Sequence, residues 1–439
     1  MGTRNADSVV GPRASMRRVT NLARRLTTAS LLAALAFGVY TNGYLQQATD
    51  SVPSSLVAAT LLTDGSFCLD RFADALREVW GAEPYFLSET RRGLMSIYPP
   101  ATGLLATPVS ALALLTTQAT APKEVIAVAH RSERYAAALI TAAAVMVFSF
   151  LCWQLGFNDW LTVGLTLFYA FGSQAFSTSS QLLWQHGPGT LFVLLAFLWF
   201  GRLRMWAAPA GTVSFALAWA IAVAIRPMNV LLVGPLVVLA LYRFPGVRAY
   251  TLLPGVLVGL PATAYNLYYF GTLGGGYGTQ PLLFSAANLA SGLPGLLLSP
   301  GRGLFLYFPV ALVVLAMAPR RCVLRDDVAR AALSAVILAI MLFASYEHWH
   351  GGVSVGPRYL SEAEAILLVL FGVAWQTLPQ RRKMPLGVLC FALLLPYSVF
   401  IQGVGTYSDA PSRWNFERTP DGVAALWDFR NNPIVHAFR

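Results

Sequence analysis

Charged residues are scarce in this sequence. Asp, Glu, Lys and Arg together make up 12% of its 439 residues, whereas a soluble domain carries about 25%. Hydrophobic residues account for 56%, and the mean hydropathy is +0.57. This balance excludes soluble, disordered and coiled-coil chains. Because several apolar runs reach the roughly 20 residues that a helix needs to cross a bilayer, the composition predicts an all-α polytopic membrane protein.

Lysine and cysteine are also scarce. Only two of the 31 basic residues are lysine, so arginine carries most of the positive charge behind the net +11. The cysteines are Cys68, Cys152, Cys322 and Cys390. They form no CxxC pair and no spacing typical of metal ligands. We therefore expect neither a structural disulfide nor a zinc site.

The apolar runs predict about eleven transmembrane helices. Residues 1–27 form a basic, cytoplasmic N-terminus, and residues 28–402 form one transmembrane domain. After the first span, the apolar runs centre near residues 145, 168, 195, 218, 236, 258, 311, 338, 368 and 393. Since a basic N-terminus stays inside, an odd number of spans places the C-terminal tail, residues 403–439, outside.

One apolar stretch, Ala101 to Thr117, is predicted to lie along the outer interface. If it crossed the membrane, every later loop would change sides, and Arg202 and Arg382 would lie outside, against the positive-inside rule. The stretch also follows two prolines and contains Pro108, which suits a surface helix. The first outer loop therefore covers residues 46–134 and contains interfacial helices.

This topology places the basic excess at the cytoplasmic surface, where it faces anionic membrane lipids and needs no nucleic-acid partner. All five histidines and the long connections fall on the outer side. The two halves share no repeat, which counts against the common transporter designs. We expect a protein of a bacterial-type inner or plasma membrane that acts at the outer face.

The first outer loop contains a candidate catalytic carboxylate. Asp50 closely follows the first span, and Tyr98-Pro99-Pro100 opens the interfacial stretch. A carboxylate fixed at the outer end of a span, under interfacial helices, is well placed to act as a base toward a lipid-borne substrate. The alternative is that Asp50 only caps the helix that follows it.

The order of these parts resembles the first outer loop of the GT-C glycosyltransferases. The likeness is to the branch of the protein O-mannosyltransferases and the lipid A aminoarabinose transferase, and it covers roughly residues 28–270 in layout. It implies a polyprenyl-phosphate-linked sugar donor, with Asp50 as the catalytic base. Two positions depart from the family pattern: Ser51 replaces a second acid, and Tyr98 replaces a basic residue that helps to hold the lipid phosphate.

Three further outer positions suit a site for phosphate and sugar. His186 lies in Trp-Gln-His-Gly-Pro between two spans, where an aromatic belt is the alternative interpretation. Arg226 ends a span, and ionisable groups at such depth are usually functional. Arg302 lies in a glycine-rich loop, where it can meet a phosphate or remain a solvated loop residue.

The densest polar cluster covers residues 345–359. It contains Glu347, His348, Trp349 and Arg358 among glycines. A metal site is conceivable here, but sugar stacking on Trp349 and phosphate pairing by Arg358 are favoured. Glu347 is the reserve candidate for the base.

These features predict an inverting glycosyltransferase. A sugar on a polyprenyl phosphate would enter from the outer leaflet, and Asp50 would deprotonate a hydroxyl of a lipid, glycan or protein acceptor. No firm cofactor is implied, and a requirement for a divalent metal stays open. The main alternative is a transporter or flippase of a polar lipid or lipid-linked saccharide; the other is an outer-face ligase or acyltransferase. Neither the sugar nor the acceptor follows from the sequence.

Overall fold

The computed structural model of the protein describes residues 12–44, 50–80, 84–206, 209–281 and 283–439. Helices make up 76% of the structure, which confirms the all-α class. Among the described residues, the strands are limited to one antiparallel hairpin of β1 (Leu87–Thr90) and β2 (Gly93–Ser96). The hairpin lies in the first outer loop, between α3 (Ala73–Trp80) and α4 (Ala101–Thr117).

The helices follow the apolar runs in order. Every run centre predicted after the first span lies in a helix, and the last, near residue 393, lies in the π-helical segment Val388–Leu394 between α16 and α17. The long helices are α1 (Pro12–Tyr40), α5 (Pro122–Gln154), α6 (Asp159–Gly172), α7 (His186–Trp206), α8 (Pro209–Ile225), α9 (Val230–Arg243), α10 (Arg248–Phe270), α14 (Asp327–Ala344), α15 (Ser361–Gln376) and α17 (Leu395–Tyr407). The shorter ones include α2 (Val52–Thr63), α11 (Leu289–Leu298), α12 (Leu304–Tyr307), α13 (Val310–Met317), α16 (Gln380–Gly387), α18 (Ala410–Arg418) and α19 (Pro433–His436).

Six candidate spans in the described part of the chain are long and apolar enough to cross a membrane. They are Thr20–Tyr40, Pro122–Gln154, Pro245–Phe270, Asp327–Ala344, Arg358–Gln376 and Gln380–Tyr407. Helix α4 is among the shorter apolar helices. A helical membrane protein is therefore supported, whereas the number of eleven spans stays a prediction.

Helix α1 begins well before the predicted start of the first span. It starts at Pro12 and runs without a break to Tyr40. Proline suits the first turn of a helix because its missing N–H is not needed there. The arginines that follow are good helix formers, so the basic segment extends the span instead of forming a separate tail.

Helix α5 links the first outer loop to the rest of the bundle. Its 33 residues correspond to roughly 50 Å at 1.5 Å per residue, whereas the hydrocarbon core of a bilayer is about 30 Å thick. Its N-terminal part packs against α2 and α4. There Val125 and Ala129 share a small core with Val52, Leu56 and Phe72. The first outer loop is thus a packed lobe with its own core.

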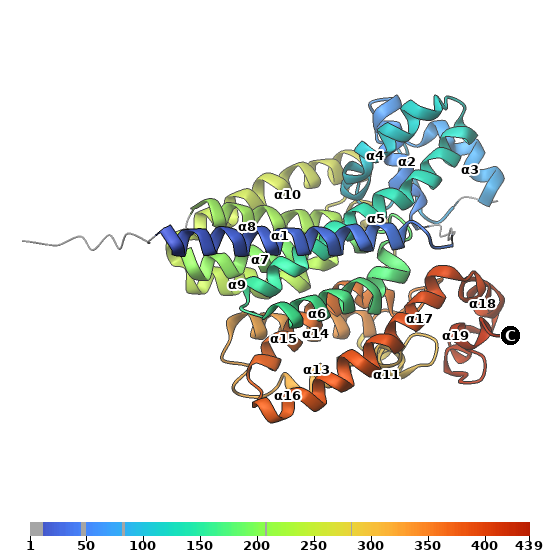
Figure 1. The fold of residues 1–439 in the computed structure, drawn as a ribbon. Coiled ribbons are helices and arrows are strands. Elements are labelled where there is room, and N and C mark those ends of the chain that lie inside the picture. The colour runs from blue at the N-terminus through green and yellow to red at the C-terminus, as the bar shows by residue number, and fades with distance from the viewer. Residues whose placement is uncertain (1–11, 45–49, 81–83, 207–208, 282) are drawn as a thin grey trace, which may run out of the picture.

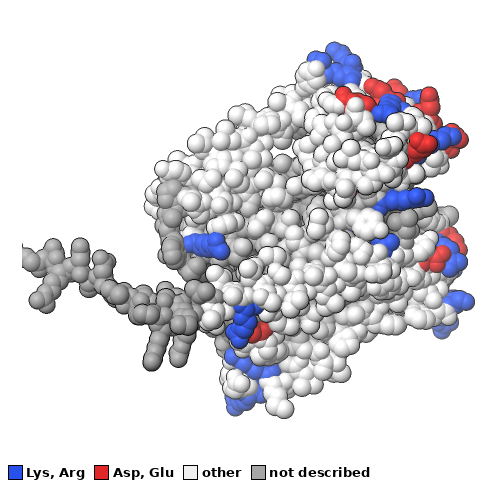
Figure 2. Space-filling view, turned by 45° about the horizontal axis from the view of Figure 1, so that its top comes forward, with Lys and Arg blue, Asp and Glu red and all other residues white. Residues whose placement is uncertain are grey.

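The lobe and the C-terminal helices gather at the same end of the molecule. Figure 1 shows α2, α3 and α4 on one side of this end and α18 and α19 on the other, whereas α1 begins at the opposite end. In Figure 2, acidic and basic side chains lie toward the two ends of the visible face, with a broad white band between them. This distribution agrees with a belt of lipid around the middle of the bundle.

Helix α15 lies at the centre of the bundle. Every residue from Ser361 to Trp375 is buried, because α6, α7, α13 and α14 surround the helix. Its first turn carries Glu362 and Glu364, which are therefore fixed inside the protein.

Candidate functional site

A cavity of about 1330 Å³ separates the first-loop lobe from the C-terminal helices. Its apolar walls include Val52, Leu56, Val79 and Ile126 on one side and Trp414, Phe416, Val423 and Leu426 on the other. Its polar lining consists of Asp50, Ser55, Tyr85, Lys123, His130, Arg302, His348, His350, Arg358, Asn415 and Arg418. Asp50 is the one carboxylate among these lining residues, so the cavity favours an amphipathic, anionic ligand.

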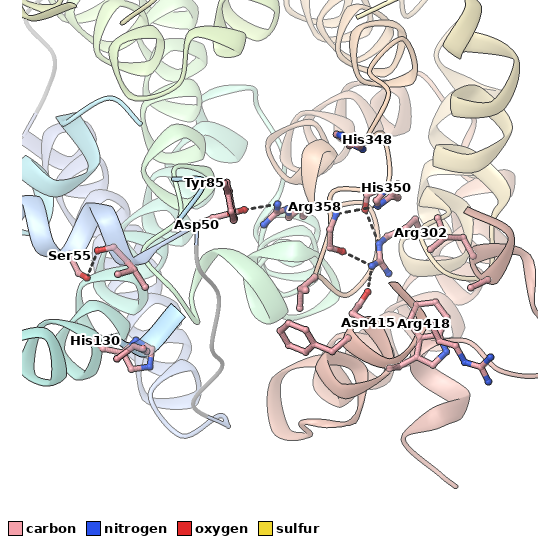
Figure 3. Close-up of a pocket in the computed structure, with 18 of the residues that line it drawn as sticks. Asp50, Ser55, Tyr85, His130, Arg302, His348, His350, Arg358, Asn415 and Arg418 are labelled. Atoms are coloured by element: carbon pink, nitrogen blue, oxygen red, sulfur yellow. Dashed lines mark hydrogen bonds and ion pairs between the residues drawn. The ribbon is translucent and has the colours of Figure 1, made fainter. Parts of the chain in front are cut away.

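Asp50 and Arg358 form an ion pair inside this cavity. Figure 3 shows Asp50 and Tyr85 on one side facing Arg358 on the other. The Arg358 NH2 group lies 2.6 Å from Asp50 Oδ2, and the two side chains are 11% and 20% exposed. The Tyr85 hydroxyl donates a hydrogen bond to Asp50 Oδ1. The Tyr98 side chain is also hydrogen-bonded to this carboxylate.

These contacts fix the charge of Asp50. Burial alone raises the pKa of the carboxyl, but the positive charge of Arg358 and the hydrogen bonds from Tyr85, Arg358 and Tyr98 outweigh it, so the pKa lies below its usual value. The N-cap position of α2 is held by Ser51. Since the Asp50 side chain points to Arg358 and Tyr85, the alternative that it only caps the following helix is not supported. Tyr98, expected near the phosphate, contacts the carboxylate instead.

A glycine-rich turn and two aromatic rings position Arg358. Gly351, Gly352 and Gly356 all have positive φ angles, which side chains rarely adopt, and this turn leads directly to Arg358. The guanidinium carbon lies 5.0 Å from the ring centre of Trp184 and 5.6 Å from that of Tyr359. Such contacts restrict a guanidinium at little cost in desolvation. Arg358 is therefore held in the cavity lining, and its pairing with a phosphate stays a prediction.

Arg302 is buried, and its guanidinium binds the loop around it. It donates to the carbonyl oxygens of His350, Gly301 and Gly352 at 2.8, 2.7 and 2.6 Å, and also to the Asn415 side chain. All of these acceptors are uncharged, and burial lowers the pKa of Arg302 to about 10. Its role as a phosphate ligand is thus not supported by its contacts. It joins the loop before Arg358 to α18 and adds positive potential at the cavity wall.

Arg226 and His186 meet away from the cavity, around a carboxylate that the sequence analysis did not single out. Arg226 NH1 lies 2.8 Å from Glu362 Oε1, and His186 Nδ1 lies 3.2 Å from Glu362 Oε2. All three side chains are buried. Arg226 also lies over Tyr359, the ring that supports Arg358. Direct contact of Arg226 or His186 with a phosphate is not supported; both belong to the scaffold behind the site.

The cluster at residues 345–352 is divided by the fold. Trp349 is buried and packs so tightly on α11 that a Cβ at Gly295 would lie 2.2 Å from its ring. Sugar stacking on Trp349 is therefore not supported. Glu347 is exposed and lies outside the cavity lining, whereas His348 lines the cavity. Among the described residues, no group of three or more His, Cys, Asp or Glu side chains is arranged to hold a metal ion.

Three parts of the site and its scaffold were missed in the sequence. Glu362 and Glu364 stand in an apolar run, and a carboxylate in such a run is unusual enough to have pointed to the buried ion pair. Tyr85 had no comparable signal, because it lies in a polar loop with no periodic pattern. The C-terminal wall of the cavity was equally hidden, since it depends on contacts between residues far apart in the chain.

Comparison with known proteins does not identify a relative. No protein-family profile matches the sequence, and no curated protein matches it. The resemblance to the GT-C glycosyltransferases therefore rests on the motifs of the first outer loop.

Proposed function

We propose that the protein is an integral-membrane glycosyltransferase of the GT-C type. It moves a sugar from a polyprenyl-phosphate donor to an acceptor hydroxyl at the outer membrane face. The observation that carries the proposal is the ion pair of Asp50 with Arg358 in a cavity of about 1330 Å³. A base and a phosphate-binding cation are the two groups that such a transfer needs.

In the proposed reaction, Asp50 takes the proton of the acceptor hydroxyl as the oxygen attacks the anomeric carbon. The bond from this carbon to the phosphate oxygen breaks, and the configuration inverts. Arg358 stabilises the leaving phosphate. Tyr85 and Tyr98 orient the carboxylate, and Arg302 fixes the loop that presents Arg358.

The proposed topology agrees with this chemistry. With eleven spans and a cytoplasmic N-terminus, both walls of the cavity would lie at the outer face, and α4 of the lobe would lie along the membrane surface. A donor lipid can then keep its polyprenyl chain in the outer leaflet while its head group enters the cavity. A fusion-reporter map that placed Arg202 and Arg382 outside would contradict this arrangement.

The proposal is tested with purified protein and a panel of labelled polyprenyl-phosphate sugars. Release of polyprenyl phosphate by the parent protein, and its loss in Asp50→Asn, is the expected result. Asp64→Asn is the matched control, because Asp64 pairs with Arg71 in the same loop but does not line the cavity. Movement of intact donor between leaflets without sugar release would support the transporter instead.

A further inference from the structure

One N–H group of the Arg358 guanidinium is not used in the pair with Asp50. Its NH2 group holds Asp50 at 2.6 Å, but its buried Nε has no hydrogen-bond partner among the residues that the structure describes. A buried donor without a partner is costly, and native proteins satisfy nearly all of them. The side chain as a whole is 11% exposed and lines the cavity, so a ligand in the cavity can approach a guanidinium that still has an unsatisfied N–H group.

The group that fits this donor is an anion with several oxygens. A planar guanidinium binds phosphate through two neighbouring N–H groups. The cavity contains the cations Lys123, Arg302, Arg358 and Arg418 against one carboxylate, Asp50. The rest of the lining is largely apolar, with Val52, Leu56, Val423 and Leu426 among its residues. We propose that Arg358 is shared between Asp50 and the phosphate of a lipid monophosphate, so that each weakens the other's hold on the guanidinium.

The sharing has a consequence for catalysis, which rests on the proposed function. In the resting protein the Asp50 carboxylate is held by Arg358 and is a weak base. A donor phosphate that takes up part of the positive charge of Arg358 makes the carboxylate more basic. Binding of the donor therefore increases the basicity of Asp50 before the sugar is transferred.

The charges also balance along the proposed transfer. The donor phosphodiester carries one negative charge, and the leaving phosphate carries two after it keeps the electron pair of the broken bond. At the same time Asp50 accepts the proton of the hydroxyl and becomes neutral. Arg358 therefore loses one anionic partner as the other gains charge, so its attraction to the phosphate is strongest when the bond has broken. An interaction of this kind stabilises the transition state more than the bound donor.

Asp50 and the lipid phosphate compete for Arg358, and we call this competition antagonism. It predicts that removing the Asp50 carboxylate tightens phosphate binding. Equilibrium binding of a polyprenyl phosphate to the detergent-solubilised protein should be about 10-fold tighter in Asp50→Asn, within the ~5–150-fold range usual for coupled sites. Arg358→Ala should bind more weakly than the parent. The double variant should bind like Arg358→Ala, because without the cation the carboxylate has nothing to compete for.

Matched controls come from a second ion pair in the same lobe. Arg71 and Asp64 lie 3.0 Å apart and outside the cavity lining, so Asp64→Asn and Arg71→Ala should bind the lipid phosphate like the parent. If Asp50→Asn does not fold, Asp50→Ser replaces it, since a serine can still accept a hydrogen bond from Tyr85 without a charge. If the neutral variant binds the lipid phosphate no more tightly than the parent does, the proposal that Arg358 is shared is wrong.

Further arms of the experiment identify the ligand and separate the two proposals. A short alkyl phosphate and inorganic phosphate are tested beside the polyprenyl phosphate, and they distinguish a lipid head group from a free phosphate. If any of the three binds more tightly to Asp50→Asn than to the parent, the result supports the proposal that Arg358 is shared. A protein that binds phosphate with this antagonism but releases no sugar contradicts the transferase alone. A protein that transfers sugar while Asp50→Asn binds no tighter contradicts the shared arginine alone.

Discussion

Two largely buried arginine–carboxylate pairs, Arg226–Glu362 and Arg358–Asp50, differ in their access to the cavity. The Arg226–Glu362 pair, at 2.8 Å, is 8% and 1% exposed and is completed by His186. The Arg358–Asp50 pair, at 2.6 Å, is 11% and 20% exposed and faces a cavity. The first pair is enclosed by the protein, whereas the arginine of the second keeps an Nε–H group without a partner among the residues that the structure describes. Ion pairs of nearly equal length can thus have a structural role or a role in ligand binding. Access to the cavity distinguishes the two roles.

The largest effect is expected in the enclosed pair. Glu362→Gln leaves Arg226 buried without its counter-charge, which costs about 3–5 kcal/mol. Equilibrium unfolding in mild detergent measures the loss. Asp409→Asn is the control, because its pair with Arg413 is exposed and should change stability by less than about 0.5 kcal/mol. If Glu362→Gln is as stable as the parent, the enclosed Arg226–Glu362 pair does not have the structural role that distinguishes it from the Arg358–Asp50 pair.

The next effect concerns the open pair. Arg358→Ala should lower the rate of sugar release by about 100-fold, since it removes the cation at the leaving phosphate. Arg358→Lys should recover only part of the rate, because a point charge lacks the planar fork and the stacking on Trp184 and Tyr359. Arg71→Ala serves as the control. A lysine variant as fast as the parent would show that charge alone is needed.

A smaller effect is expected in the pH dependence of stability. The pKa of folded Asp50 is depressed, so its pair stabilises the protein above the usual carboxyl pKa of about 3.9, and this contribution is lost as the pH falls through the lower, folded value. The parent should exceed Asp50→Asn by roughly 1 kcal/mol at neutral pH. The difference, followed by thermal unfolding at a series of pH values, should shrink below pH 4. If the difference in stability between the parent and Asp50→Asn does not change with pH, the ion pair does not stabilise the folded protein.

The smallest effect is expected at Glu347. This residue was the reserve candidate for the base, but its side chain is exposed and outside the cavity lining. Glu347→Gln should change the rate of sugar release by less than about twofold, a result typical of surface substitutions. A loss as large as that of Asp50→Asn would move the role of the base to Glu347.

Local patterns in the sequence were sufficient for the helices and for some members of the site. Apolar runs marked the helices, and a carboxylate after a span or an arginine after glycines marked Asp50 and Arg358. Their pairing was not predictable, because it joins the first outer loop to a turn late in the chain. The same applies to Trp349, whose burial is decided by a glycine of α11. Arg302 shows the limit most clearly, since only its acceptors reveal that it binds the loop.

The rate of sugar release by Asp50→Asn measures whether Asp50 is the base of the proposed sugar transfer. Asparagine keeps the shape of the side chain but removes its basicity, so sugar release under saturating donor should fall by about 100-fold or more. Donor binding should be retained or tighter, which separates lost chemistry from lost folding. An Asp50→Asn protein that releases sugar at the parent rate would show that Asp50 is not the base.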